Sequence, residues 1–387
     1  MDAAELVREY LRLGLRIGRL DPDFVLSCVG EPRLHSVIAR EPISVPGVLA
    51  ERAQLLFASV PDVGFAAPRA AFLSAQLAAL ELRARRLAGE QASFRAEVAA
   101  CFGISLEPGD PDRYRRAHAE LAELLPGSGP VADRLALLAR RERVPPPLLA
   151  RGVAELARAL RARVRAEPGL PVQERVDHRY VRGRPWSALH RYLGDFRSLV
   201  AVNPDRQVWA GRLPALVAHE SYPGHHAEHC RKERELVGAR GWAEHGIALR
   251  DGPQSLLAEG VAELGLRIAV GPGWGRWAQD VLAEAGIRVD GERAERVLAA
   301  LDGLREVRSD AALLLHDGPG IDAAAAHLHR WACLPADGVR AFLRFAADPR
   351  WRLHVVTYAE GARRVARRLE AGEGVRRLLD EPWTPGG

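Results

Sequence analysis

The stretch VAHESYPGHHAEHC, residues 217–230, combines the start of a metal-binding helix with residues that break helices. A His-Glu pair, as at 219–220, is how the helix of many zinc peptidases begins, but their H-E-x-x-H signature needs a second histidine four residues after the first. That position is Pro223, and the next histidines are His225 and His226. The central question is therefore whether this stretch binds a metal, and through which histidines.

Helical geometry decides which of these histidines share a face. On an unbroken helix His219 and His225 diverge by about 120°. His219 and His226 share a face, but their Cα atoms lie about 10.5 Å apart along the axis, so one ion could barely be reached by both. Proline disrupts the helical hydrogen bonds, and glycine permits backbone angles that other residues avoid. Pro223 and Gly224 therefore predict a two-residue bulge or break that brings His225 onto the face of His219.

Two other interpretations of the stretch stay open. The helix could simply end at the YPG sequence, with the histidines clustered by chance. Alternatively, a metal could be bound through His226 and Cys230, which are spaced as i and i+4 and share a helix face.

A third ligand must come from elsewhere in the chain, because a catalytic zinc needs about three protein ligands and one open position. The run LLAEGVAELG, residues 256–265, offers Glu259 and Glu263 on one predicted helix. Glu259 lies between apolar neighbours, near the buried face of that helix. A buried carboxylate needs a partner or a metal, whereas a surface glutamate would need neither.

Three pieces of the sequence, HESYPGHH, AEGVAELG and VVTYAEGARRV, together resemble a known family. They are similar to the family called domain of unknown function 885, whose pattern is H-E-x-x-P-G-H-H, then E-G-W-A, then Y-x-x-G near the C-terminus. That family is regarded as related to gluzincin metallopeptidases such as the Taq-type carboxypeptidases. The resemblance covers at least residues 195–370. Val261 stands where the family has Trp, and Glu228 where it often has Gln.

The resemblance implies roles for individual residues. The zinc ligands would be His219, His225 and Glu259, and the general base would be Glu220. Tyr358 matches the tyrosine near the C-terminus, and the run RSDAALLLHDGPG, residues 308–320, suggests that Arg308 and His316 face the site. These residues, or His354, would donate to the developing oxyanion. For Tyr358 and His316 a structural role in the core is the alternative.

The sequence therefore predicts a zinc-dependent hydrolase, a metallopeptidase that could be carboxypeptidase-like, with a peptide or small amide as substrate and Zn as cofactor. One alternative is a zinc hydrolase of non-peptide amides or esters. Another is a non-catalytic helical binding protein with a relic metal site. The presence of Glu220 argues against a relic, because a structural zinc site needs no general base.

Helical periodicity dominates the rest of the chain, as in the apolar spacing of residues 69–102. The expected fold is mainly α, a large gluzincin-like single domain with a small β-sheet beside the active-site helix. Residues 1–165 would form a helical N-terminal region and residues 166–387 the metal-binding catalytic region, in one compact unit with a central cleft. The best strand candidate is RSLVAVN, residues 197–203, and an edge strand beside the metal helix would pair with the substrate backbone.

Composition limits the partners and the compartment. Hydrophobic residues make up 48 % and charged residues 27 % of the 387, and the net charge is only +5, as in a soluble globular protein. Arginines alternate with Leu, Ala and Val as on solvated helix faces, so no nucleic acid is expected as a partner. No long uncharged apolar stretch occurs, so no membrane span is expected. The four cysteines form no CxxC pair and the N-terminus resembles no signal peptide, which predicts a cytoplasmic location. The sequence does not indicate the oligomeric state.

Overall fold

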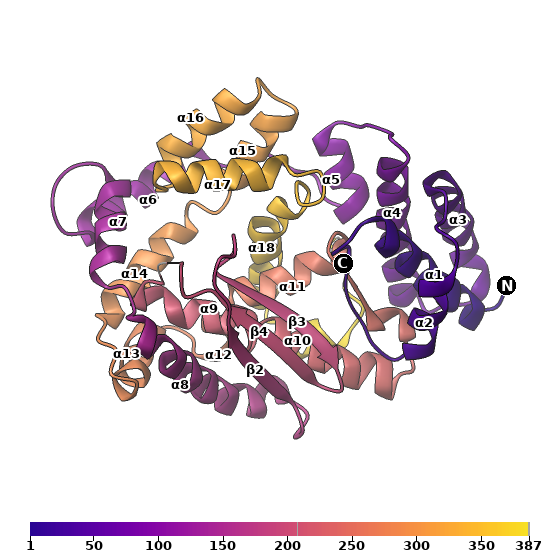
Figure 1. The fold of residues 1–387 in the computed structure, drawn as a ribbon, viewed down its shortest axis with the longest axis horizontal. Coiled ribbons are helices and arrows are strands. Elements are labelled where there is room, and N and C mark those ends of the chain that lie inside the picture. The colour runs from indigo at the N-terminus through magenta and orange to yellow at the C-terminus, as the bar shows by residue number, and fades with distance from the viewer. Residues whose placement is uncertain (207, 386–387) are drawn as a thin grey trace.

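The computed structural model describes residues 1–206 and 208–385 and is built mainly of helices (Figure 1). Helix accounts for 65 % of the structure and strand for 7 %, so the predicted mainly α class with a small sheet is confirmed. The helices form because apolar residues recur at helical spacing. In α1 (Ala3–Leu20), for example, Leu6, Tyr10, Leu13 and Ile17 are buried on one face.

The elements follow one another along the whole chain. The helices after α1 are α2 (Pro32–Arg40), α3 (Pro46–Ser59), α4 (Ala67–Leu87), α5 (Phe94–Phe102), α6 (Pro111–Leu124), α7 (Val131–Arg141), α8 (Pro146–Val164), α9 (Leu213–Glu220), α10 (His225–Arg231), α11 (Pro253–Glu263), α12 (Gly265–Ala269), α13 (Trp274–Glu284), α14 (Gly291–Asp302), α15 (Val307–His316), α16 (Ile321–Trp331), α17 (Ala336–Ala347), α18 (Thr357–Glu370) and α19 (Val375–Asp380). The strands are β1 (Val25–Cys28), β2 (Arg175–Tyr180), β3 (Ala188–Gly194), β4 (Arg197–Val202) and β5 (Ile247–Leu249). Short 3₁₀ or π turns lie at Val60–Val63, Arg165–Gly169, Ala210–Arg212, Lys232–Ala239, Ala243–Gly246 and His354–Val356.

The N-terminal helices contain two features that local periodicity did not predict. The helical run at 69–102 is two helices, α4 and α5, because Gly89 between them adopts a left-handed conformation with φ of 93°. Strand β1 lies within the region predicted to be helical nearly throughout. It forms because β5, far downstream in the sequence, pairs with it in antiparallel register, Val25 opposite Leu249.

The main sheet has the strand order β2–β4–β3, with β2 parallel and β3 antiparallel to β4. Strand β4 confirms the strand predicted at 197–203. It is the central strand, however, so both of its edges are occupied and it cannot pair with a substrate. The strand beside α9 and α10 that lies at the edge of the sheet is β3.

The sheet shares one apolar core with helices α8, α9 and α10. Val200 and Val202 of β4 belong to the same buried cluster as Leu156 of α8 and Val217 of α9. Figure 1 shows α9, α10, α11 and α18 near the middle of the molecule, with α1–α4 at the right, α13 and α14 at the left and α15–α17 at the top. This core therefore fixes α9 and α10 against the sheet.

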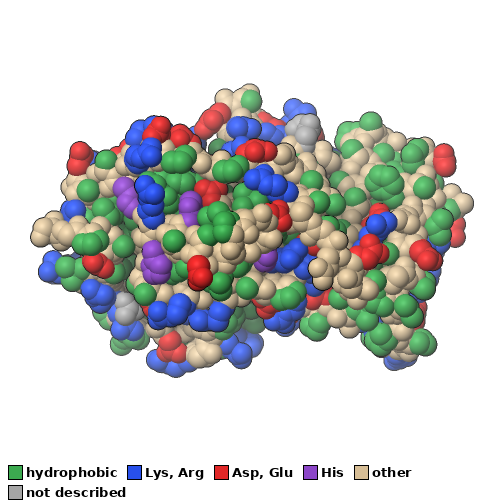
Figure 2. Space-filling model, turned by 90° about the horizontal axis from the view of Figure 1, so that it is seen from above, with side chains coloured by type: hydrophobic (Ala, Val, Ile, Leu, Met, Phe, Trp, Pro, Cys, Tyr) green, Lys and Arg blue, Asp and Glu red, His purple; other side chains and the backbone are tan. Residues whose placement is uncertain are grey.

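The surface is mixed in charge. Figure 2 shows arginine and acidic side chains interspersed with apolar ones over the face that it draws. Among the described residues, no helix is both long enough and apolar enough to cross a membrane.

Candidate metal centre

The helix break predicted from Pro223 and Gly224 is present between α9 and α10. Helix α9 ends at Glu220, and α10 begins at His225. The peptide bond between Tyr222 and Pro223 is cis. The two histidines of the predicted site therefore lie on different helices, one at the end of α9 and the other at the start of α10.

Backbone hydrogen bonds show that the break inserts two residues. The N–H of Gly224 donates to the carbonyl of Ala218 at 2.9 Å, and the N–H of Ala227 donates to the carbonyl of Ser221 at 3.2 Å. Both bonds join residue i to residue i−6, where a regular helix joins i to i−4. Gly224 is required here because a Cβ at that position would lie 1.9 Å from the carbonyl oxygen of His219.

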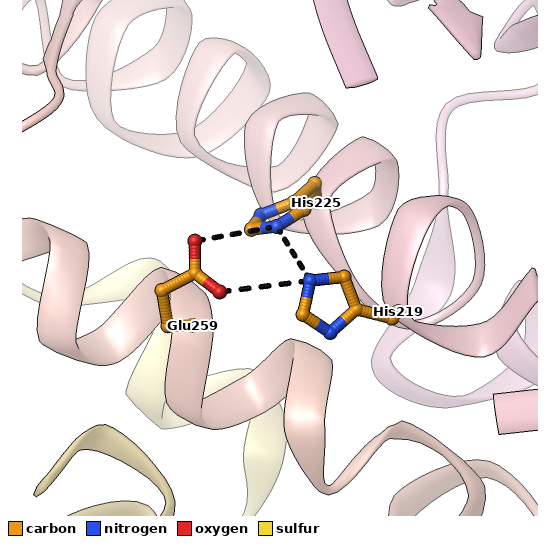
Figure 3. A group of neighbouring side chains, drawn as sticks. All are labelled: His219, His225 and Glu259. Carbon is orange, nitrogen blue, oxygen red and sulfur yellow. Dashed lines mark hydrogen bonds and ion pairs between the residues drawn. The ribbon is translucent and has the colours of Figure 1, made fainter. Parts of the chain in front are cut away.

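His219, His225 and Glu259 converge on one point (Figure 3). The Nε2 atoms of His219 and His225 are 3.2 Å apart. Oε2 of Glu259 lies 3.5 Å from Nε2 of His219, and its Oε1 lies 3.6 Å from Nε2 of His225. Bonds of about 2.0–2.2 Å in a tetrahedral zinc site place neighbouring ligand atoms roughly 3.3–3.5 Å apart. The three side chains therefore have the spacing of zinc ligands.

The same three residues pass a chemical test for a bound cation. The side chain of Glu259 is buried, and its Oε2 has no hydrogen-bond partner among the described residues. An ionised carboxylate oxygen that is buried without a hydrogen bond is costly, and a cation bound to it removes that cost. The side chains of His219 and His225 keep 18 % and 16 % of their surface exposed, so one side of the centre is open to solvent. The donor set and the open side both fit a zinc ion.

Further side chains orient these ligands. Oε1 of Glu263 lies 3.4 Å from Nδ1 of His219. Nε2 of His354 lies 3.4 Å from Oε1 of Glu259, and its Nδ1 lies 3.1 Å from the carbonyl oxygen of Arg250. Such contacts on the outer side of a ligand fix its orientation in metal sites. Glu263, the alternative third ligand, thus contacts the nitrogen of His219 that faces away from the shared point.

Carboxylates surround His219 with negative charge. Burial would lower the pKa of His219, but the hydrogen bond with Glu263 and the charges of Glu220 and Glu259 raise it to about 9. The negative field that favours a proton on this ring also favours a metal cation in its place. For His225, by contrast, burial lowers the pKa to about 4, so the ring is neutral and its nitrogen is available as a ligand.

The acidic groups of the centre differ from one another in pKa. Burial would raise the pKa of Glu259, but the neighbouring histidines lower it to about 2. The pKa of Glu263 is also lowered to about 2, because contact with His219 outweighs burial. Burial raises the pKa of Glu220 to about 7, and attraction by His219 offsets this only in part. A divergence of this kind separates groups that stay ionised from a group that exchanges protons near neutral pH.

Two of the other predicted site residues lie beside the centre. The ring of Tyr358 stands edge-on to His354, with the ring centroids 5.5 Å apart. Burial and then the nearby carboxylates raise the pKa of Tyr358, so its hydroxyl stays protonated at neutral pH. Arg308, on α15, is exposed, and the negative charge of Glu263 acts on its guanidinium.

The prediction that His316 faces the site is corrected. Its Nε2 lies 2.9 Å from the carbonyl oxygen of Ala346, and its ring stacks on Phe94 with centroids 4.9 Å apart. On α15 it lies about 12 Å further along the helix than Arg308 and about 80° round from it. This geometry directs His316 to the packing between α5, α15 and α17.

The alternative ligand pair His226 and Cys230 is not part of the centre. Nδ1 of His226 lies 2.8 Å from Oγ of Ser198, and its Nε2 lies 3.0 Å from Oε2 of Glu174. Both ring nitrogens are therefore engaged by side chains. Cys230 contacts the same ring at 3.5 Å, and neither residue belongs to the three-residue metal-binding group found among the described residues.

Sequence reasoning missed the polar residues behind α10. Glu174 and Ser198 belong to no motif, and no local pattern identified them. His190 could have been found, because in β3 it alternates with Tyr192 onto one face. That face meets the metal-binding helices: the ring of His190 stacks on His225 with centroids 5.6 Å apart.

Comparisons with known proteins give information on the fold alone. No protein-family model matches the chain, and no curated protein sequence matches it. The crystal structure of the "putative lipoprotein" from Colwellia psychrerythraea is similar, with a TM-score of 0.55 and 15 % sequence identity over 87 % of this chain. The chain spans 64 % of that protein's length. A second similar structure, the "putative lipoprotein of unknown function" from Shewanella oneidensis, has a TM-score of 0.49 and 13 % identity, over 95 % of this chain and 76 % of that one.

Proposed function

We propose that this protein is a zinc-dependent metallopeptidase, as the resemblance to the domain of unknown function 885 family and to gluzincins implies. The observation that carries the proposal is the convergence of His219 and His225 on the buried carboxylate of Glu259, which has an unpartnered oxygen. Two imidazoles and one glutamate are a ligand set used by catalytic zinc in peptidases. A structural zinc site has four protein ligands, so a set of three supports a catalytic role.

These three residues would hold a zinc ion, which would supply a water activated for attack at neutral pH and a Lewis acid for the substrate carbonyl. Glu220, which directly follows the ligand His219, is the proposed general base. It takes the proton of the attacking water and passes it to the leaving amine. A pKa near 7 suits this role, since proton transfer is most effective when the pKa of the base lies near the working pH. Tyr358, as a protonated phenol, donates to the carbonyl oxygen as negative charge develops there.

Two arginines support a carboxypeptidase-like substrate. Arg308 and Arg212 are both exposed and act on each other electrostatically. Among the described residues, neither guanidinium makes an ion pair or a hydrogen bond. Guanidinium groups bind carboxylates with two parallel hydrogen bonds. A free C-terminal carboxylate of a peptide is therefore the proposed partner of these arginines.

Hydrolysis of a matched substrate panel tests this function. N-blocked dipeptides with a free carboxyl terminus, the same peptides with an amidated terminus, and an ester analogue are assayed before and after treatment with a zinc chelator. We expect hydrolysis of the free-carboxylate peptides, loss of hydrolysis on chelation, and recovery when zinc is returned. Arg308→Gln should raise KM for the free-carboxylate peptides more than for the amidated ones.

Each of the other outcomes favours a different function. Cleavage of the ester alone would support the non-peptide hydrolase, and zinc binding without any hydrolysis would support a binding protein. If Arg308→Gln changed KM equally for both peptide series, the carboxypeptidase-like substrate would be wrong.

A further inference from the structure

One buried carboxylate bonds to residues on both sides of the helix break. Oε2 of Glu174 accepts a hydrogen bond from the hydroxyl of Tyr222 at 2.7 Å and one from Nε2–H of His226 at 3.0 Å. Tyr222 precedes the Pro223–Gly224 pair, and His226 follows the metal ligand His225. The same oxygen therefore joins the two chain segments that the break separates.

Glu174 is suited to this position because its charge is fixed and balanced. The residue is 1 % exposed, and its Oε1 accepts from the guanidinium of Arg161, which also donates to the backbone carbonyl of Glu174 at 2.8 Å. Burial would raise the pKa of Glu174, but the hydrogen bonds from His226, Tyr222 and Arg161 lower it below its ordinary value. The group is a carboxylate at neutral pH, and it can only accept hydrogen bonds.

The carboxylate also fixes the direction of a longer chain of hydrogen bonds. Because Glu174 only accepts, Nε2 of His226 carries the hydrogen. In an imidazole with its hydrogen on Nε2, the other ring nitrogen is an acceptor, so Nδ1 of His226 accepts from the hydroxyl of Ser198 at 2.8 Å. The Ser198 oxygen is left to accept from Nε2–H of His190, also at 2.8 Å. The chain of hydrogen bonds ends at His190, and the ring of His190 stacks on the proposed metal ligand His225.

We propose that Glu174 is the positioning residue for the metal centre: by binding Tyr222 and His226 it holds the two-residue break in the shape that aims His225 at His219 and Glu259. This inference rests on the proposed zinc-binding function. Glu174 touches neither the ion nor a substrate, so it is not a catalytic residue. Its contribution resembles that of outer-shell groups in metal sites, whose loss typically costs 10–100-fold in metal affinity.

Metal affinity in matched tyrosine variants tests the inference. Tyr222→Phe deletes one hydroxyl that binds Glu174, across the break. Tyr192→Phe deletes a hydroxyl that donates to another carboxylate, Glu233, which follows α10 in the chain and does not bridge the break. Zinc dissociation constants are measured for the folded proteins by competition with a chromophoric chelator, and the visible absorption of the cobalt-substituted proteins reports ligand geometry.

We expect Tyr222→Phe to weaken zinc binding by about tenfold and Glu174→Gln by on the order of 10–100-fold. Both variants should alter the cobalt spectrum, and Tyr192→Phe should leave affinity and spectrum unchanged. If Tyr222→Phe binds zinc as tightly as wild type, with an unchanged cobalt spectrum, the positioning role is wrong even though the zinc site stands. If Glu174→Gln fails to fold, the result for Tyr222→Phe alone decides whether Glu174 has the positioning role. If the wild-type protein binds no zinc, the proposed function itself is wrong.

Discussion

Gly260 of α11 and Gly361 of α18 touch backbone to backbone. A Cβ on Gly260 would lie 2.4 Å from the carbonyl oxygen of Gly361, and a Cβ on Gly361 would lie 2.9 Å from the backbone nitrogen of Gly260. The contact brings Glu259, the residue before Gly260, beside His354, which lies in the short turn before α18, and near Tyr358 at the start of α18. Two small residues on facing helices thus set the position of Glu259, the proposed third metal ligand.

Replacing Gly260 with alanine should force α11 away from α18. We expect Gly260→Ala to lower the free energy of unfolding by about 1–3 kcal/mol, the usual cost of overpacking, and to weaken zinc binding because Glu259 moves with the helix. Gly47→Ala is a suitable control, since a Cβ on Gly47 of α3 would meet nothing within 4 Å. Urea denaturation measures the free energy of unfolding of both variants. Equal stability of Gly260→Ala and Gly47→Ala would contradict the close contact.

A second prediction concerns Gly224 in the helix break. A Cβ at position 224 would lie 1.9 Å from the carbonyl oxygen of His219, so Gly224→Ala cannot keep the two histidines in their present positions. Zinc affinity should fall by on the order of 100-fold or more. Gly374→Ala, where a Cβ has no neighbour within 4 Å, should bind zinc like wild type. Undiminished affinity in Gly224→Ala would show that the break does not build the site.

The two glutamates of α11 should differ in their effect on the metal. Glu259→Ala removes a proposed ligand and should abolish stoichiometric zinc binding. Glu263→Gln should keep the zinc with affinity reduced by about tenfold, because Glu263 only orients His219. Metal analysis after gel filtration separates the two results. If Glu263→Gln loses the zinc and Glu259→Ala retains it, the ligand assignment must be exchanged.

Glu220 separates metal binding from chemistry. Glu220→Gln should retain one zinc per chain yet lower kcat by several orders of magnitude, because a neutral amide cannot take the proton of the attacking water. Zinc content and peptide hydrolysis are measured on the same preparation, with Glu123→Gln, an exposed glutamate of α6, as the control. Near wild-type turnover in Glu220→Gln would remove this residue from the mechanism.

Local sequence patterns were sufficient to predict most helices and the approach of His219 to His225 in the candidate site. Apolar spacing predicted the mainly α fold, and the chemistry of Pro223 and Gly224 predicted the two-residue insertion that brings His219 and His225 together. Steric rules for proline and glycine act within a few residues, so they can be applied without a structure. The third ligand was narrowed to Glu259 or Glu263 because both lie on one apolar helix.

Features that depend on distant contacts could not be predicted in the same way. Strand β1 exists because β5 pairs with it, and β4 became the central strand because β2 and β3 both pair with it. The contact between Glu174 and His226 forms only when two segments that share no sequence motif come together in the fold. His316 was misplaced because a motif indicates a helix but does not give the direction of each side chain. The cytoplasmic location, the division at residue 165 and the central cleft remain predictions.

The most direct test of the account is anomalous diffraction at the zinc absorption edge from crystals of the wild-type protein grown with zinc. The account predicts one strong anomalous peak per chain, within bonding distance of Nε2 of His219, Nε2 of His225 and the carboxylate of Glu259, and no peak at His226 or Cys230. The absence of a peak between those three side chains, or a peak bound by His226 and Cys230 instead, would contradict it.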